Sequence, residues 1–197
     1  MKARILGLVA VGLFAGSLSA HAANISALPG PTGLTLINDF EITKDNAVVT
    51  FDSTAALDLA SVWTSNVTPS GVRGLVENRG NEPLIGVLAS PTTALGLWFG
   101  NDDFSLVFDA ILEVYSGATL LGSVSLAANR NDWADQFLGL QSDVAFDSFH
   151  VRYQRDQAQN LSIYVDDLYL RTVPEPASLA LLGLGLAGLG LSRRRRA

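Results

Sequence analysis

Residues 106–126 read LVFDAILEVYSGATLLGSVSL, two alternating runs joined by the turn-forming stretch Ser116-Gly117-Ala118-Thr119. In the first run, every second residue from Leu106 to Val114 is apolar, so these side chains share one face of an extended chain. In the second run, Ser123 and Ser125 alternate with apolar neighbours. Alternation with period two on both sides of a glycine-containing turn predicts an antiparallel β-hairpin.

The same period continues outside the hairpin, in residues 95–99 and 149–153. In the last apolar run, residues 161–170, the parity changes at Asp166-Asp167, and one extra residue there would keep Leu168 and Leu170 on the inner face. We therefore expect a β-bulge at this pair. Since no stretch of the body keeps a helical period, we predict an all-β fold, an antiparallel β-sandwich of jelly-roll type, and leave the strand order in residues 54–91 open.

The first 22 residues have the pattern of a secretory signal peptide. Lys2 and Arg4 precede an apolar run over residues 5–18, and Ala20 and Ala22 provide the small side chains that signal peptidase requires. We therefore predict cleavage after Ala22 and divide the chain into a signal peptide (1–22), a β-sandwich body (23–172) and a C-terminal segment (173–197).

The charge distribution makes the body strongly acidic. Six of the thirteen basic residues and one of the nineteen acidic residues, Glu175, lie in the two terminal segments. In the body, eighteen acidic residues therefore face only seven basic ones, a net charge of −11. Such a surface repels nucleic acid and anionic lipid and favours cations. The chain has no cysteine, which excludes disulfides, a thiol nucleophile and a cysteine metal site.

The C-terminal segment has three parts in a fixed order. Pro174-Glu175-Pro176 is held extended by its prolines, and the apolar run over residues 177–191 is rich in glycine and leucine. As a helix this run would span roughly 22 Å, less than the ~30 Å of a hydrocarbon core. Arg193, Arg194, Arg195 and Arg196 follow and mark the cytoplasmic side. The segment therefore predicts a temporary inner-membrane anchor with the body in the periplasm.

These three parts resemble the PEP-CTERM sorting signal. The resemblance covers about 25 residues and implies recognition by an exosortase, a membrane-embedded protease-transpeptidase of Gram-negative bacteria that make exopolysaccharide. It implies final delivery to the cell surface or to an extracellular biofilm matrix. It says nothing about the fold of the body.

The body is in turn similar to a recurrent secreted domain that resembles carbohydrate-binding jelly rolls. The similarity rests on residues 99–103, 112–124, 129–132 and 165–168. That domain has no settled activity to transfer.

Calcium is the cofactor that the acidic turns suggest, because hard cations prefer carboxylate and carbonyl oxygens. The candidate ligands are Asp102 and Asp103 and, at the expected bulge, Asp166 and Asp167. A further oxygen-rich cluster comprises residues 129–132 with Asp135. Aspartate and asparagine also favour tight turns for local reasons, so a role in turns alone stays open.

Exposed aromatic faces would bind a polysaccharide, and Trp63, Trp98 and Trp133 are the candidates. Trp133 lies in a polar stretch, as a ligand-binding aromatic in a loop would, and Trp98 opposes an apolar face. The alternative for Trp63 and Trp98 is a place in the core. For Trp133 the alternative is a structural role, in which its side chain covers a loop.

No catalytic constellation is evident in the body. His150 is its single histidine and alternates with apolar neighbours, which does not suit a Ser-His-Asp triad or a zinc site. We therefore expect a non-enzymatic binding or matrix module. The alternatives are a carbohydrate-active enzyme, favoured by two buried carboxylates in one cleft, and a self-associating surface protein, favoured by a long unprotected edge strand.

Overall fold

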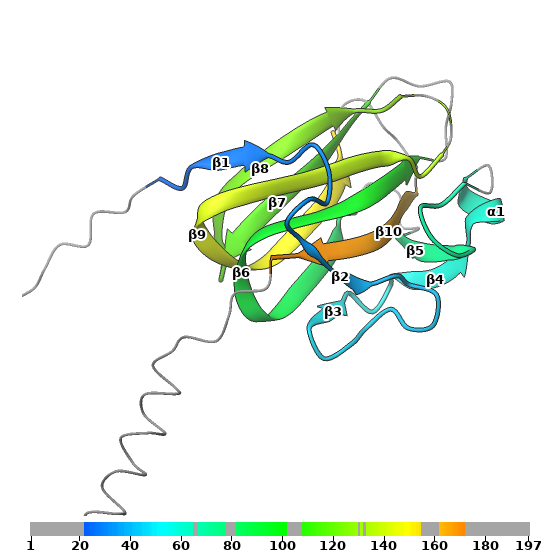
Figure 1. Cartoon of the computed structure of the whole chain (residues 1–197), viewed down its shortest axis with the longest axis horizontal. Helices are drawn as coiled ribbons and strands as arrows, with labels where there is room; N and C mark the ends of the chain where they lie inside the picture. Colours follow the sequence, from blue (N-terminus) through cyan, green and yellow to red (C-terminus); the bar gives the residue numbers. More distant parts are fainter. Residues whose placement is uncertain are drawn as a thin grey trace, which may run out of the picture.

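The computed structural model describes residues 22–64, 67–77, 82–101, 108–129, 131, 133–154 and 162–171. These residues form ten strands and one short helix (Figure 1). Every strand pair is antiparallel, which confirms the predicted all-β antiparallel fold. In chain order the elements are β1 (Ile25–Ala27), β2 (Thr35–Asn38), β3 (Val49–Phe51), β4 (Ala56–Leu59), α1 (Ala60–Trp63), β5 (Arg73–Glu77), β6 (Leu84–Asn101), β7 (Asp109–Ser116), β8 (Thr119–Ala127), β9 (Gln136–Tyr153) and β10 (Ile163–Leu170).

Most of both predicted terminal segments falls outside this description. Residues 1–21, with the predicted cleavage residue Ala20, and the whole sorting segment 173–197 are not among the described residues, and of the predicted signal peptide only Ala22 is described. Within the described ranges, no helix has the length and apolar character that crossing a membrane requires.

Two 18-residue strands, β6 and β9, run through both layers of the sandwich. Their pairing is interrupted between Val87 and Ala94, where the register shifts twice. Pro91 lies in this interruption and has no N–H to donate to a ladder. On either side of it, the two halves of β6 pair with different neighbours, β3 in the first half and β10 in the second.

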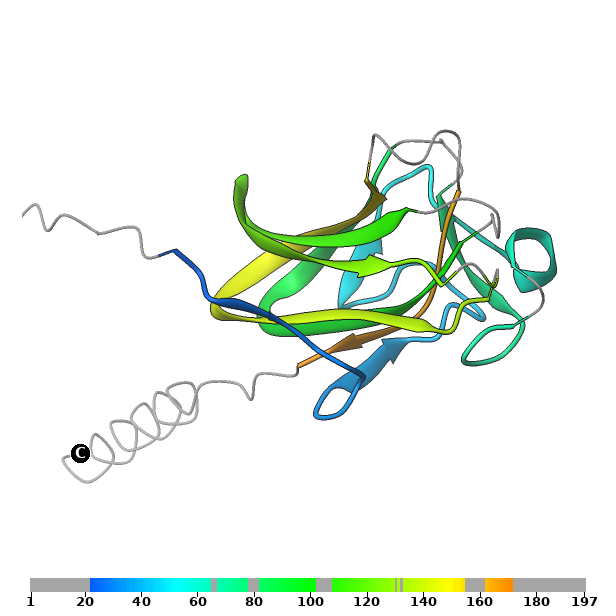
Figure 2. The ribbon, with the colours of Figure 1, turned by 90° about the horizontal axis from the view of Figure 1, so that it is seen from above.

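The result is two layers that share β6 and β9 (Figure 2). One layer contains β3, the first half of β6, the second half of β9, β7 and β8. The other layer contains β4, β5, β10, the second half of β6, the first half of β9 and β1. Strand β2 also belongs to this layer, because it pairs with the last residues of β10 while β5 pairs with the first residues. The segment 54–91, whose strand order could not be predicted from the sequence, contains β4, α1, β5 and the start of β6.

One hydrophobic core fills the space between the layers. It includes the inward residues that the alternation predicts, Phe108, Ala110, Leu112 and Val114, all fully buried. Phe149 is packed against Phe51 with ring centroids 6.0 Å apart. Apolar burial of this extent is the main stabilising contribution to such a fold.

The predicted hairpin and the predicted bulge are both confirmed. β7 and β8 are joined across Ser116 and Thr119, with Gly117 at a φ of 56°. In β10 the register shifts between Asp166 and Tyr169, and Asp167 has a φ of 47°. The extra residue places Leu168 in the core.

Candidate functional site

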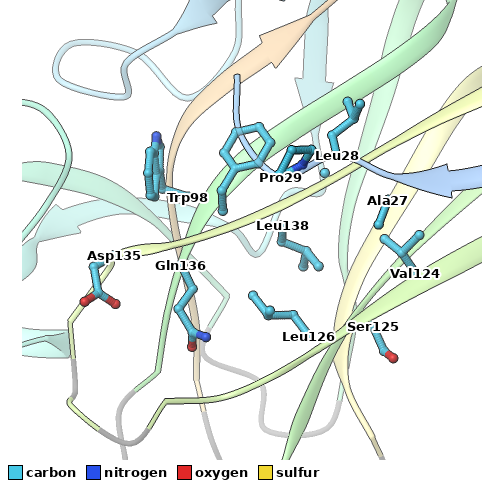
Figure 3. Close-up of a pocket in the computed structure, with 12 residues that line it drawn as sticks. Ala27, Leu28, Pro29, Trp98, Val124, Ser125, Leu126, Asp135, Gln136 and Leu138 are labelled. Carbon is cyan, nitrogen blue, oxygen red and sulfur yellow. The ribbon is translucent and has the colours of Figure 1, made fainter. Parts of the chain in front are cut away.

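A cleft of about 460 Å³ opens along the edge of β9, between the end of β1 and strand β8. The β1 segment leaves β9 just before the cleft, where the Leu28 amide donates to the Gly139 carbonyl at 2.9 Å. Figure 3 shows Trp98, Leu28 and Pro29 on one side of the β9 backbone and Leu126, Leu138 and Gln136 on the other. The cleft is therefore walled mostly by apolar side chains from several elements, with Ser125, Asp135 and Gln136 as its polar side chains.

Trp98 belongs to a row of aromatic rings on the outer face of this layer. Its ring lies 5.5 Å from that of Phe137, which in turn lies 6.2 Å from Tyr169. All three side chains are half-buried. The row crosses β6, β9 and β10, so its members come from distant parts of the sequence.

Two glycines allow Phe137 to lie flat in this row. A Cβ at Gly96 would come within 2.2 Å of the Phe137 ring, and one at Gly139 within 2.5 Å. Any larger residue at either position would lift the ring from the sheet. Phe137 and Tyr169 were not among the aromatic residues predicted from the sequence. The signal that could have found Phe137 is its position two residues before Gly139, on the outward parity of β9.

The predicted ligand aromatic Trp133 lies in the loop that leads into the cleft. Its side chain is 43% exposed. Asp135 holds this loop, because its two carboxylate oxygens accept hydrogen bonds from the side-chain amides of Asn129 at 2.8 Å and Asn131 at 2.7 Å. The oxygen-rich loop thus uses the Asp135 carboxylate to fix its own conformation. The side chain of Trp63 is not described.

The acidic pair at the bulge is buried rather than open to solvent. Asp166 is 0% exposed, and its carboxylate accepts hydrogen bonds from the backbone amides of Asp167 at 2.8 Å and, at a longer 3.4 Å, Ser70. Asp167 accepts from the Ser70 hydroxyl at 2.7 Å and the Tyr169 hydroxyl at 3.1 Å. Burial and then the neighbouring Asp167 charge raise the pKa of Asp166 to about 7.

The calcium prediction remains a prediction. Among the described residues, no three acidic or histidine side chains converge as a metal-binding group. Asp102 and Asp103 lie outside those residues, so the structure does not place them relative to Asp166 and Asp167.

The outward position predicted for His150 is confirmed. The residue lies on the outer face of the other layer, where its ring is 4.4 Å from that of Tyr115. Its other neighbours include Glu113 and Arg152, which form an ion pair with a shortest distance of 2.6 Å. Burial lowers the pKa of His150.

Comparison with known proteins finds similarity both to a sequence family and to solved structures. A family model described as the PEP-CTERM protein-sorting motif matches residues 172–196. No curated protein matches the chain. A solved structure of TmCBM61 in complex with beta-1,4-galactotriose aligns with a TM-score of 0.32 and 12% identity, over 62% of this chain and 85% of that one. This TM-score is too low to support an argument about the body.

The motif match agrees with the residues that the sequence analysis selected, Pro174, Glu175, Pro176 and Arg193–Arg196. It implies export followed by exosortase-dependent sorting through a membrane-anchored tail. The chain therefore carries a PEP-CTERM protein-sorting motif at residues 172–196, and this motif is a feature of the C-terminal segment and not of the fold of the body.

Proposed function

We propose that this protein is an exported, non-enzymatic module that binds a polysaccharide in the cleft beside Trp98 and is delivered to the cell surface or biofilm matrix by exosortase processing. The observation that carries the binding proposal is the composition of the cleft. Trp98 and Phe137 offer flat apolar surface, and Ser125, Asp135 and Gln136 are the polar residues of the lining. Hydrogen bonds to Asn129, Asn131 and Ala127 hold Asp135 and Gln136 in place, and their oxygens keep lone pairs that can accept from sugar hydroxyls. Sugar rings require this combination, because they present apolar C–H faces between hydroxyl groups.

The non-enzymatic part of the proposal rests on the state of the buried acids. In the described part of the chain these are Glu77, Glu113, Asp166 and Asp167. Each accepts a hydrogen bond from a protein group: Glu77 from the Thr54 hydroxyl, Glu113 from Arg152, Asp166 from an amide and Asp167 from Ser70. None of the four lines the cleft beside Trp98. Glycoside hydrolysis would need two such groups facing a substrate.

Replacing Trp98 with alanine is expected to weaken glycan binding about tenfold, because the ring supplies apolar contact area and stacking worth roughly 1–2 kcal/mol. Binding is measured by isothermal titration of the full-length chain in detergent, after a glycan array has selected an oligosaccharide. Trp133→Ala tests whether the site extends to the loop. Leu120→Ala removes an apolar side chain that is 50% exposed outside the cleft and serves as the matched control.

Circular dichroism should show that all three variants remain folded. Binding that is equal in the wild type and in Trp98→Ala, with both proteins folded, would remove the cleft as the ligand site. A wild-type chain that binds no glycan would overturn the binding proposal as a whole.

Sorting is tested independently of binding. Mass spectrometry of the protein from the envelope or matrix of native cells is expected to show an N-terminus at Ala23 and loss of the arginines 193–196, because signal peptidase and exosortase act at opposite ends of the body. Substituting Glu175 with alanine should leave the tail uncut and the protein in the inner membrane. Mature surface protein that still carries its arginines would contradict exosortase processing.

One observation favours self-association as a second candidate function. Strand β8 has nine residues, carries no charge and pairs only with β7 among the described strands. The other strands that pair with a single described strand are β1, β2, β3 and β4, and each has three or four residues. Long uncharged edges are the ones that add further strands, so the mass of the chain in solution separates this candidate from a monomeric module.

A further inference from the structure

We propose that the protein has a second saccharide site, on the outer face of the layer that contains β7, and that the two sites together cross-link polysaccharide chains. This inference rests on the proposed function, because it assigns the same class of ligand to a different surface. The site is a depression of about 520 Å³ lined by Glu82, Pro83, Glu113, Tyr115, His150 and Arg152. None of these residues lines the cleft beside Trp98.

The register of β7 and β9 brings the functional groups together. Glu113 lies directly opposite His150, and the neighbouring pairs place Tyr115 and Arg152 diagonally across from them. Inward-facing neighbours Phe149 and Val151 are fully buried, so His150 and Arg152 must point outward. Glu82 and Pro83 precede β6, whose Ile85 pairs with His150, and they form the rim of the depression.

A fixed carboxylate and guanidinium form the polar part of this site. Glu113 Oε1 accepts from Arg152 Nη2 at 2.6 Å and from Nε at 3.0 Å, and its Oε2 accepts from the Tyr115 hydroxyl at 2.8 Å. Burial raises the pKa of Glu113, but the hydrogen bonds from Arg152 and Tyr115 outweigh it, so the pKa is lowered and the carboxylate stays charged. Adjacent donors and acceptors held in this way match the neighbouring hydroxyls of a sugar ring.

The aromatic part of the site is the pair of half-buried rings of Tyr115 and His150. Their centroids lie 4.4 Å apart with an interplanar angle of 36°, so the two rings are stacked with a tilt. The ring face that each keeps on the side away from the other is the aromatic surface of the site. A pyranose ring places its C–H face against such a surface. The outer face of this layer therefore offers both contacts that a saccharide needs.

The charges select an uncharged sugar. Within the depression Arg152 is neutralised by Glu113, and the exposed Glu82 adds a negative charge at the rim. The body around it is strongly acidic. A uronate or phosphate would meet net repulsion here, whereas a neutral sugar with adjacent hydroxyls would not.

Two sites on different layers of one rigid sandwich would hold two chains at once. Both layers share β9, with Phe137 near its start and His150 near its end, so neither site can move independently of the other. Binding at both would convert a soluble neutral polysaccharide into a network. This is a mechanical function that a single site cannot supply.

The test uses the full-length chain in detergent with soluble galactan, glucan and mannan, and with alginate as the anionic probe. For the neutral polymer that binds, titration with its oligosaccharide is expected to give two sites per wild-type chain. Light scattering should show that the chain cross-links the polymer. Tyr115→Ala combined with His150→Ala should reduce the stoichiometry to one and abolish cross-linking. Trp98→Ala should weaken the other site about tenfold, so that at oligosaccharide concentrations that saturate only the stronger site one site is seen and cross-linking is lost.

Val87→Ala is the matched control, since Val87 is 49% exposed in the same layer but does not line the depression. Tyr115→Phe keeps the ring and loses only the hydroxyl, so it should retain most of the binding. Thermal melts establish that each variant is folded.

The outcomes separate this inference from the proposed function. One wild-type site that is lost in Trp98→Ala, or stronger binding of alginate than of every neutral polymer, overturns the second site and leaves binding in the cleft intact. One wild-type site that is lost in Tyr115→Ala combined with His150→Ala overturns the cleft and supports the site described here. A chain that binds none of the four polymers contradicts both.

Discussion

Asp166→Asn is expected to stabilise the protein strongly at pH 8, by a smaller amount at pH 5, and almost not at all at pH 4 or below. Asp166 is fully buried, and its pKa in the folded protein is about 7 against an ordinary value of 3.8. Between these values the folded protein keeps a proton that the unfolded chain has lost. The free energy of unfolding therefore falls as the pH rises from about 4 to about 7, and above that the full cost of the buried charge remains.

The size of this effect follows from the shift in pKa. About three pKa units correspond to about 4 kcal/mol, which we take as the upper limit of the gain in the asparagine variant above pH 7. Burial of the carboxyl group is the largest cause of the raised pKa of Asp166. The charges of Asp167 and the more distant Glu41 raise this pKa further, and the amides of Asp167 and Ser70 lower it by stabilising the charged form. Asparagine keeps one oxygen to accept from the Asp167 amide, so the local bulge should persist.

Denaturant unfolding of the full-length chain at pH 5, 6, 7 and 8 measures this difference. Asp39→Asn removes a carboxylate from an exposed position and controls for the lower net charge of the variant. A constant difference between wild type and Asp166→Asn across this range would show that Asp166 does not titrate in it.

The alternation in the sequence was sufficient to predict strands, their inner faces and the bulge. Each of these depends on local parity, as in Phe108 to Val114 or in the shift at Asp166-Asp167. The continuous paths of β6 and β9 through both layers could not be predicted in this way. They depend on which strands pair on each side of Pro91, and those partners are distant in the sequence.

The candidate site was only partly visible in the sequence for the same reason. Trp98 stood out because it opposes an apolar face, but Phe137 and Tyr169 join it only once β6, β9 and β10 are side by side. The burial of Asp166 was also unexpected. The backbone amide of Ser70, which is 96 residues away in the sequence, donates a hydrogen bond to the Asp166 carboxylate. A turn that was predicted to bind calcium is therefore buried by a loop that is distant in the sequence.

Phe149→Ala is expected to destabilise the fold by about 3–5 kcal/mol, the usual range for removing a phenyl ring from a core. Phe149 is fully buried and lies opposite Gly86 in the pairing of β6 with β9. A Cβ at Gly86 would be 2.3 Å from the Phe149 ring, so the ring occupies the space that a side chain on β6 would fill. Because Gly86 has no side chain to move into the cavity, we place the loss near the top of this range.

A double-mutant cycle distinguishes this packing from a general sensitivity of the core. In the wild type, Gly86→Ala should be destabilising because the new methyl group meets the ring. In Phe149→Ala the same methyl group enters the cavity, so the double variant should be more stable than the sum of the two single changes predicts. Phe149→Leu provides a milder background if the alanine variant does not fold. Strictly additive losses of stability, measured by denaturant unfolding, would mean that the Phe149 ring does not rest on Gly86. Gly86 would then not be the residue that allows the first half of β6 to pack closely against the second half of β9.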